Sequence, residues 1–329
     1  MEPRFTARAK GGLALIVLTV AITLFATAGA AGVWALSPGR FEGGDGDLVA
    51  SLDNLDWGNM PGVVPKNDLP SGTSDDSLQG KEDDPIPGLV FGSIPKNKSD
   101  LLRFYVANEQ VLGQDLLYLA WVRGDSLGTA NMDFEFNQSS AISSNGVTPV
   151  RTHDDLLITF DLAAGGNQVN LGFSRWRAAG SNLPCQAAPA PPCWGPIQLL
   201  SGIAEGAVNT ADIPDDPIGG GTLLAQTFGE AAINLTDAGV FSSSTECVVF
   251  GSVYLKSRSS DSFTTSLKDF VKPIGVSVSN CATVARASSI RPSWPSAALR
   301  PARQNPDWDT VTFSTHRLHI DVASSYWVA

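Results

Sequence analysis

The side chains in this sequence that could bind a metal ion or catalyse a reaction are carboxylates, because several of them lie close together along the chain. Short acidic runs punctuate the glycine-rich first third of the chain, and one alternates with aromatic residues further on. Hard cations such as Ca²⁺ bind where several carboxylate and carbonyl oxygens converge. None of these runs is a twelve-residue EF-hand loop, and acidic loops are also common as solvated surface. Ca²⁺ is therefore the candidate cofactor, the alternative being none, and its candidate ligands are Asp45, Asp47, Asp75, Asp76, Asp83, Asp84, Asp133 and Glu135.

The pair Asp133 and Glu135 raises the alternative of glycoside hydrolysis. Side chains two positions apart on a strand lie about 7 Å from each other, near the separation of the two carboxyl groups in inverting glycosidases. Carboxylates on a solvated strand face are equally commonplace. His153 stands beside two aspartates, but no GxSxG elbow supplies a nucleophile for it. With no complete set of catalytic roles, we predict a non-enzymatic protein.

A tryptophan between two arginines is the candidate for ligand binding. Trp176 is flanked by Arg175 and Arg177 at the end of an expected strand, and we predict that its ring is exposed to a glycan or a protein. Trp121, inside the apolar run LLYLAWV, is predicted to be buried instead.

Four cysteines predict two disulfides, because an even number in an oxidising compartment usually pairs. Cys185 and Cys193 bracket a short proline- and alanine-rich loop, which leaves Cys247 to pair with Cys281. Zinc is the alternative, but no CxxC spacing and no nearby histidine supports it.

The elements that position these residues are strands. In residues 131–137, Met132, Phe134 and Phe136 share one face while the polar residues share the other. Comparable patterns bounded by turn residues predict strands at 101–107, 115–123, 131–137, 156–162, 169–176, 196–200, 230–235, 245–255 and 274–281.

One segment has helical spacing. Its apolar residues recur at i, i+4, i+7 and i+8 from Phe263, and this predicts a short helix at about 261–271. Ser260 or Asp261 is the expected cap, and Pro273 is the expected stop. The predicted fold is therefore an all-β, jelly-roll-like β-sandwich with one short helix.

The two ends of the chain differ from the middle. Residues 1–30 combine basic residues, the apolar run 13–25 and a small-residue exit, which predicts a cleaved signal peptide, with a retained membrane anchor as the alternative. Residues 31–40 read as a linker and 41–281 as the sandwich. Residues 282–329 contain no Gly and no Lys, which favours a reading-frame slip or an arginine-rich linker toward a cell wall.

Several strings in the middle of the chain resemble a known family. GSIPKNKSDLLRFYV (92–106), NMDFEFNQS (131–139), GVTPVRTHDDLLITFDL (146–162), TFGEAAINL (227–235) and GSVYLKSRSSDSFTTSLKDFV (251–271) are similar to the N-terminal head region of large actinobacterial surface proteins. In that family the head precedes prealbumin-like or Ig-like repeats. The resemblance implies a non-enzymatic β-sandwich on the cell surface, and it ends after Cys281.

The net charge of the chain limits the kinds of molecule that it can bind. The chain carries a formal net charge of −11, which disfavours nucleic acid and anionic lipid surfaces. We predict a secreted or cell-surface module with a structural or adhesive role, an extracellular glycan or protein as partner, and membrane contact only through an uncleaved leader. A calcium-dependent carbohydrate-binding module is the first alternative, and a glycoside hydrolase is the second.

Overall fold

The computed structural model describes residues 35–281, except 73, 93–97, 127, 167 and 242–246. The predicted signal peptide, residues 31–34 of the linker and the atypical tail 282–329 lie outside the described residues. Within those that are described, no helix is long and apolar enough to cross a membrane.

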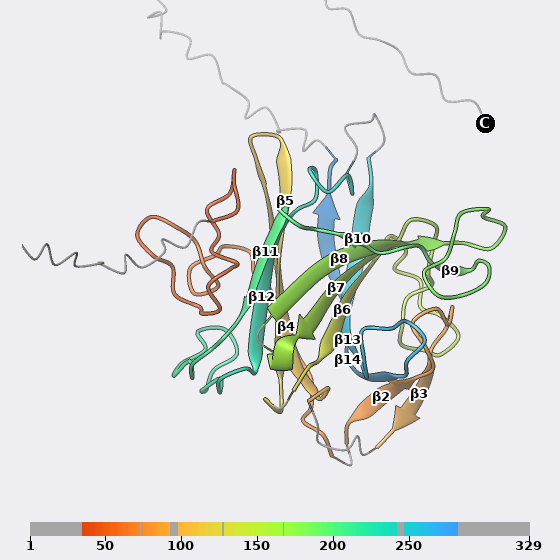
Figure 1. Ribbon diagram of the computed structural model, residues 1–329, viewed down its shortest axis with the longest axis horizontal. Coiled ribbons are helices and arrows are strands. Elements are labelled where there is room, and N and C mark those ends of the chain that lie inside the picture. The colour runs from red at the N-terminus through yellow and green to blue at the C-terminus, as the bar shows by residue number, and fades with distance from the viewer. Residues whose placement is uncertain are drawn as a thin grey trace, which may run out of the picture. The chain divides into compact units, whose positions relative to one another are not determined.

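Two antiparallel sheets form the fold (Figure 1). The small sheet has the order β1 (Val64–Asn67), β4 (Leu101–Val111), β5 (Gln114–Arg123), β12 (Phe228–Asn234) and β11 (Ala204–Val208). The large sheet has the order β10 (Gln198–Leu199), β8 (Gln168–Arg177), β7 (Leu156–Ala163), β6 (Asn131–Asn137), β13 (Val249–Arg258), β14 (Leu267–Ser279), β2 (Asp76–Gln79) and β3 (Gly88–Phe91), with β9 (Cys193–Trp194) paired to β8. A single 3₁₀ turn, η1 (Ala164–Gly166), joins β7 to β8.

The main core lies between the inner faces of the two sheets. Alternation along β6 turns Phe134 inward, where its ring meets Phe104 of β4 edge-on at 6.0 Å between centroids. Trp121 of β5 meets Phe160 of β7 in the same way at 5.4 Å, and it is fully buried as predicted. Each such aromatic contributes about 1.5–3 kcal/mol by leaving water. The predicted all-β sandwich is confirmed.

Both outer faces are also covered. The N-terminal segment packs on the small sheet, where Phe41 stacks on Tyr118 with 4.2 Å between ring centroids (red and orange in Figure 1). On the large sheet, Leu78 of β2 packs against Tyr254 and Phe270, while Phe263 packs with two tryptophans of β8 and β9. Side chains that alternate to the outside of either sheet are therefore not automatically in water.

The predicted helix at 261–271 is wrong. Phe263 lies in a loop, and Leu267 begins the strand β14. The pairing of β14 with β13 shifts register three times, and at each shift one residue of β13 stands opposite two of β14. Each bulge inserts an extra residue into β14, so Leu267 and Phe270 both pack in the outer cluster with Leu78, while Val271 faces the main core. Burial on both faces at this spacing mimics the pattern of a helix.

Both predicted disulfides are present. Cys185 pairs with Cys193 at a Cα–Cα distance of 5.7 Å, and Cys247 pairs with Cys281 at 4.7 Å. The second bridge joins the segment before β13 to the segment after β14. Because it closes a loop with a sequence separation of 34 residues, it stabilises the fold by about 3–4 kcal/mol through the unfolded chain.

Candidate functional site

The outer face of β6 carries a buried set of charges. Asp133 and Glu135 turn away from the main core, yet both are 0% exposed. The neighbouring strand β13 places Lys256 directly opposite Asp133, and Arg258 lies two positions further along on the same face. We call the full set the large-sheet ion network: Glu82, Asp133, Glu135, Arg151, Asp161, Lys256 and Arg258.

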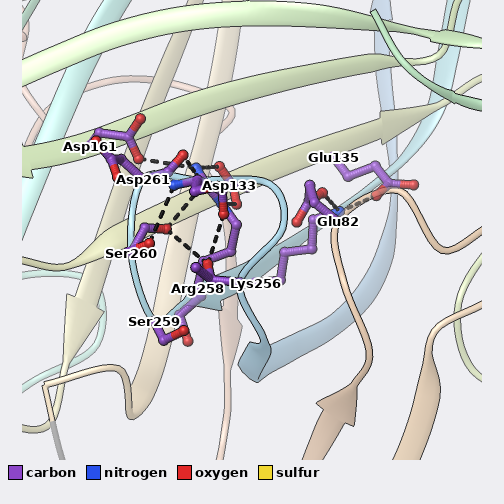
Figure 2. A network of polar contacts seen from close by, with 12 residues as sticks. Glu82, Asp133, Glu135, Asp161, Lys256, Arg258, Ser259, Ser260 and Asp261 are labelled. Carbon is purple, nitrogen blue, oxygen red and sulfur yellow. Dashed lines mark hydrogen bonds and ion pairs between the residues drawn. The ribbon is translucent and has the colours of Figure 1, made fainter. Parts of the chain in front are cut away.

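Arg258 holds one end of the network (Figure 2). Its Nη2 donates to Asp133 Oδ1 at 2.9 Å and to Asp161 Oδ1 at 3.0 Å, and its Nε donates to the other oxygen of Asp133. Its Nη1 donates to the backbone carbonyls of Ser260 and Asp261 in the loop before β14. The guanidinium thus binds a carboxylate in the bidentate geometry that favours arginine over lysine.

Glu135 holds the other end. Arg151 donates to both of its oxygens, from Nε at 2.8 Å and from Nη2 at 2.7 Å. Tyr254 adds a hydroxyl at 2.6 Å, and Lys256 bridges Glu135 to Glu82 by ion pairs to both. Figure 2 shows Lys256 between these two carboxylates. The strand residue Glu135 is thereby tied to the β2–β3 loop, which carries Glu82.

Two tryptophans close the network from outside. The guanidinium carbon of Arg151 lies 4.7 Å from the ring centroid of Trp176 and 5.1 Å from that of Trp194. The two rings meet edge-on with 5.2 Å between centroids. A cation above aromatic faces is stabilised most where water is excluded, as it is here. Trp194 is held in turn by Asp83, whose Oδ1 accepts its backbone N–H at 2.8 Å.

The prediction that Trp176 is exposed is therefore wrong, because its side chain is only 2% exposed. The residues that cover it come from loops remote in sequence, which local pattern does not reveal. Its flanking arginines are also engaged: Arg175 donates to the carbonyl of Val240 at 2.6 Å, and Arg177 pairs with Asp154 at 3.0 Å. An open depression of about 310 Å³ still uses Trp176 and Arg151 in its wall, beside the half-exposed Ile86, Ile142 and Val150.

Charge in the network is nearly balanced, with four carboxylates and three cations. Burial raises the pKa of Glu135, but Arg151 and Lys256 outweigh it and hold that pKa well below its usual range. Burial dominates at Asp161, where it raises the pKa to about 7 despite Arg258, and it also raises the pKa of Glu82. One proton on either of these two carboxyls neutralises the whole set.

The surroundings of Asp133 and Glu135 differ from those of the two carboxyl groups in a glycosidase. A glycosidase needs one carboxyl group that keeps its proton and a second that reaches the substrate. Glu135 stays ionised, and both side chains are saturated by cations beneath the covering loops. The same ion pairs occupy the oxygens that a metal ion would need, because Arg151, Lys256 and Arg258 already supply the positive charge.

The remaining predicted metal ligands fall into different surroundings. Asp47 Oδ1 accepts the N–H of Val49 at 2.7 Å, and Asp84 Oδ2 accepts that of Lys81 at 2.8 Å, so both stabilise turns. Asp76 pairs with Lys272 at 3.1 Å. Asp45 and Asp75, in contrast, each belong to a group of converging carboxylates.

The first group, the small-sheet acidic cluster, consists of Glu42, Asp45, Asp56 and Glu230. One oxygen of each of the first three lies within 4.8 Å of the others. Glu230, fully buried on β12, accepts the N–H of Gly46 at 2.7 Å and the indole N–H of Trp57 at 2.9 Å. Gly46 has φ +79°, and a Cβ there would lie 2.8 Å from the carbonyl oxygen of Val208, so glycine allows this approach.

Protons neutralise much of this cluster. Burial raises the pKa of Asp56 to about 9 and that of Glu230 well above its usual value, and neighbouring carboxylates add to both shifts. Asp45 and Glu230 share a hydrogen bond between carboxyl groups, which requires one proton. At Glu42 burial acts in the same direction, but hydrogen bonds from Asn54 and Ser51 lower its pKa. Among the described residues, no Lys or Arg forms an ion pair with these four.

The second group, the inter-sheet acidic cluster, consists of Asp68, Asp75 and Asp269. One carboxylate oxygen of each lies within 4.8 Å of the other two. Asp68 follows β1 of the small sheet, whereas Asp75 precedes β2 and Asp269 lies in β14 of the large sheet. Burial raises the pKa of Asp269 to about 9 and that of Asp68 to about 7. This cluster and the small-sheet acidic cluster are the carboxylate groups that could hold a cation in the described part of the chain.

In comparisons with protein-family models, curated proteins and solved structures, nothing matches this chain. The resemblance to actinobacterial surface proteins therefore stays a prediction, and functional arguments rest on the geometry.

Sequence reasoning considered Glu82 only as one of a run of acidic residues, and it missed Arg151, Asp161, Lys256 and Arg258. A signal for two of them existed. Tyr254, Lys256 and Arg258 alternate in the sequence YLKSR just as Asp133 and Glu135 alternate in MDFEF. Complementary charges at alternate positions indicate two strands that pair on a covered face. No comparable pattern marks Glu82 or Arg151, which reach the network from loops.

Proposed function

We propose that this chain is a non-enzymatic, extracytoplasmic surface module with a structural or adhesive role. The observation that carries the proposal is the pair of disulfides in a domain whose described cysteines are all bridged. Such bridges persist in oxidising compartments and are rare in the cytosol. The predicted leader and the resemblance to actinobacterial surface proteins agree with this location.

The buried charges support a structural role over catalysis. The carboxylate pair that sequence offers for hydrolysis serves instead to join β6, β13 and three covering loops. Removing one partner of a buried ion pair leaves an uncompensated charge and is strongly destabilising. These residues are therefore needed for the stability of the fold.

The depression beside Trp176 supports the adhesive role. Ile142 is 53% exposed and Ile86 is 47% exposed at its rim. Apolar side chains that surround a concave patch with a few polar groups are typical of sites that bind another molecule. An apolar segment of an extracellular protein fits this lining best.

A calcium-dependent carbohydrate-binding module is the second candidate. The inter-sheet acidic cluster favours it, because carboxylate oxygens that converge in an extracellular domain are typical of calcium sites. A glycan array probed with and without EDTA separates the two candidates: binding to sugars that EDTA abolishes supports the second one.

Location is tested by expressing the full chain with its own leader in an actinobacterial host. We expect the protein outside the cytoplasm, with Cys185–Cys193 and Cys247–Cys281 found by mass spectrometry of non-reduced peptides. Free thiols in protein recovered from the cytoplasm would sink the proposal.

Adhesion is tested with an Ile142→Asp variant. A charge at this rim position should reduce retention of the purified chain on isolated cell envelopes by about tenfold, because an apolar contact is replaced by a desolvated carboxylate. The matched control is Leu199→Asp, which alters a residue that is 71% exposed outside the depression. Equal retention of both variants would rule out the depression as the contact surface, and turnover in a hydrolase screen would overturn the non-enzymatic function.

A further inference from the structure

We propose that the inter-sheet acidic cluster of Asp68, Asp75 and Asp269 is a binding site for one Ca²⁺ ion that fastens the two sheets to each other. This inference does not depend on the proposed adhesive function, and its test is independent of any partner.

The spacing of the oxygens suits one calcium ion. A carboxylate oxygen from each aspartate lies within 4.8 Å of the other two. Calcium–oxygen distances are 2.3–2.6 Å, so ligands of the same ion are separated by at most about 5 Å. Three oxygens at this spacing can therefore contact one ion without rearrangement of the backbone.

Unpartnered oxygens provide an independent indication of a ligand. Asp68 Oδ2 and Asp75 Oδ2 are buried and have no hydrogen-bond partner in the described part of the chain. Asp75 as a whole is only 1% exposed, so water does not replace the missing partner. Ser71 Oγ, between them in sequence, is also buried without a partner. Native proteins rarely leave buried polar atoms unsatisfied, and unpartnered oxygens on two converging carboxylates indicate an ion or a water that binds there.

The backbone holds these side chains in place. Asp269 accepts the N–H of Leu101 at 2.6 Å and that of Phe270 at 2.8 Å, while Asp75 Oδ1 accepts the N–H of Asp76 at 2.9 Å. At Asp75 one oxygen is thus anchored and the other is left open. A preorganised ligand of this kind loses little conformational entropy when it binds an ion.

Charge favours a cation of two charges. The described residues provide no ion pair to Asp68, Asp75 or Asp269; the nearby Lys272 pairs with Asp76 and is half-exposed. Asp100 adds a further negative charge beside Asp75. In the large-sheet ion network cations pair directly with the buried carboxylates, whereas here the nearby Lys272 forms its ion pair with Asp76.

The chemistry of the ligands selects calcium among the common divalent ions. All of the converging groups are oxygens, whereas zinc sites in proteins use histidine and cysteine. Magnesium requires a near-ideal octahedron and retains several waters, whereas calcium accepts irregular oxygen sets. Three carboxylates from separate elements form an irregular set of this kind.

The position of the site gives it a structural role. Asp68 directly follows β1 of the small sheet, Asp75 directly precedes β2, and Asp269 of β14 lies opposite Ser77 in the large sheet. The start of β4 is joined to the same group through Leu101. An ion bound here links these elements at one end of the sandwich.

The test is calcium titration of the purified, disulfide-bonded full chain after EDTA treatment and dialysis. Calorimetry should show one site with a dissociation constant of about 0.1–1 mM, the range of extracellular modules. At about 5 mM Ca²⁺ the melting temperature should rise by about 2–4 °C. The same concentration of Mg²⁺ should produce less than half of that shift.

Two isosteric variants remove ligands. Asp75→Asn and Asp68→Asn should each weaken calcium binding at least tenfold, while their melting temperatures without calcium should equal or exceed that of the wild type, because repulsion falls. The matched control is Asp56→Asn in the small-sheet acidic cluster, which should bind calcium as the wild type does. Circular dichroism verifies that each variant is folded.

Three results would overturn the proposal. These are no heat and no melting shift with Ca²⁺, unchanged binding in both ligand variants, and loss of binding only in Asp56→Asn. Equal binding of Mg²⁺ would overturn the assignment to calcium. None of these outcomes bears on retention by cell envelopes, so failure here is distinguishable from failure of the proposed function.

Discussion

The outer faces of the two sheets bury carboxylates in opposite ways. On the large sheet, Asp133 and Glu135 are paired with Arg258, Arg151 and Lys256. On the small sheet, Glu230 has no cation among its described neighbours, and it accepts hydrogen bonds from Trp57 and Gly46 instead. Asp133, Glu135 and Glu230 are each fully buried, so water does not stabilise the charge of any of them.

The difference shows two ways to neutralise an acidic group in a medium of low dielectric constant. A cation lowers the pKa of the carboxyl and keeps it ionised, whereas isolation raises the pKa until a proton is retained. Cations keep Glu135 ionised, whereas Asp56 and Glu230 retain a proton. The two faces should therefore respond with opposite sign to the loss of a charge and to a change in pH.

The largest effect is expected from Lys256→Met. This change leaves Glu82 and Glu135 with one cation fewer in a fully buried site, and it should lower the free energy of unfolding by about 3–5 kcal/mol. Denaturant unfolding followed by tryptophan fluorescence provides the measurement. The matched control is Lys272→Met, which removes a half-exposed pair with Asp76 and should cost at most about 1 kcal/mol. Similar losses in both variants would contradict the view that burial makes the network important.

A second, intermediate effect is expected from pH. The folded-state pKa of Asp56 is raised to about 9, so between pH 4 and 9 the folded chain holds a proton that the unfolded chain releases. The resulting stability is complete below pH 4 and is lost as pH rises, by at most about 1.4 kcal/mol per pH unit for one group. The lowered pKa of Glu135 acts in reverse, since its contribution is lost as pH falls below about 4.5.

Urea midpoints measured from pH 3 to pH 9 test this pair of slopes. We expect a maximum near pH 5 and a decline of about 2–4 kcal/mol toward pH 8. Stability that increases steadily from pH 5 to pH 8 would contradict the retention of protons by Asp56 and Glu230 in the small-sheet acidic cluster and by Asp269 in the inter-sheet acidic cluster.

The smallest effect, and the one of opposite sign, is expected from Asp56→Asn. The amide keeps the oxygen that accepts the N–H of Trp57 and presents N–H groups to the remaining carboxylates. At pH 8 it should raise the free energy of unfolding by about 1–2 kcal/mol, and it should flatten the slope between pH 5 and pH 8. The measurement is the same urea series. A loss of stability at pH 8 would show that the ionised carboxylate is required.

Periodicity was a reliable guide wherever one face of a strand meets the main core. All nine predicted strands overlap observed ones, because inward residues such as Phe134 and Phe136 alternate without interruption. It failed in β14, where bulges change the spacing, and it missed the four-residue strands β1, β2 and β3, whose pairing depends on partners far away in sequence. Short strands carry too few residues for a period to be detected.

Of the candidate site residues, the cysteines were predicted with their partners, and Asp45 and Asp75 do lie among converging carboxylates. Their companions were missed, because tertiary packing brings them together from separate segments of the chain: Glu42, Asp56 and Glu230 in one cluster, and Asp68 and Asp269 in the other. Trp176 was misplaced because its cover comes from loops remote in sequence.

The sequence by itself determined the strand-rich class of the fold, the pairing of its cysteines and the alternation that sends one face of each strand to the core. These properties are local, since they depend on residue type, spacing and the order of the chain. Only the tertiary structure decided which carboxylates face a cation, which keep a proton and which are left with unpartnered oxygens. The pKa of a buried group is set by the elements that pack against it, and here those elements are strands and loops up to 184 residues away along the chain.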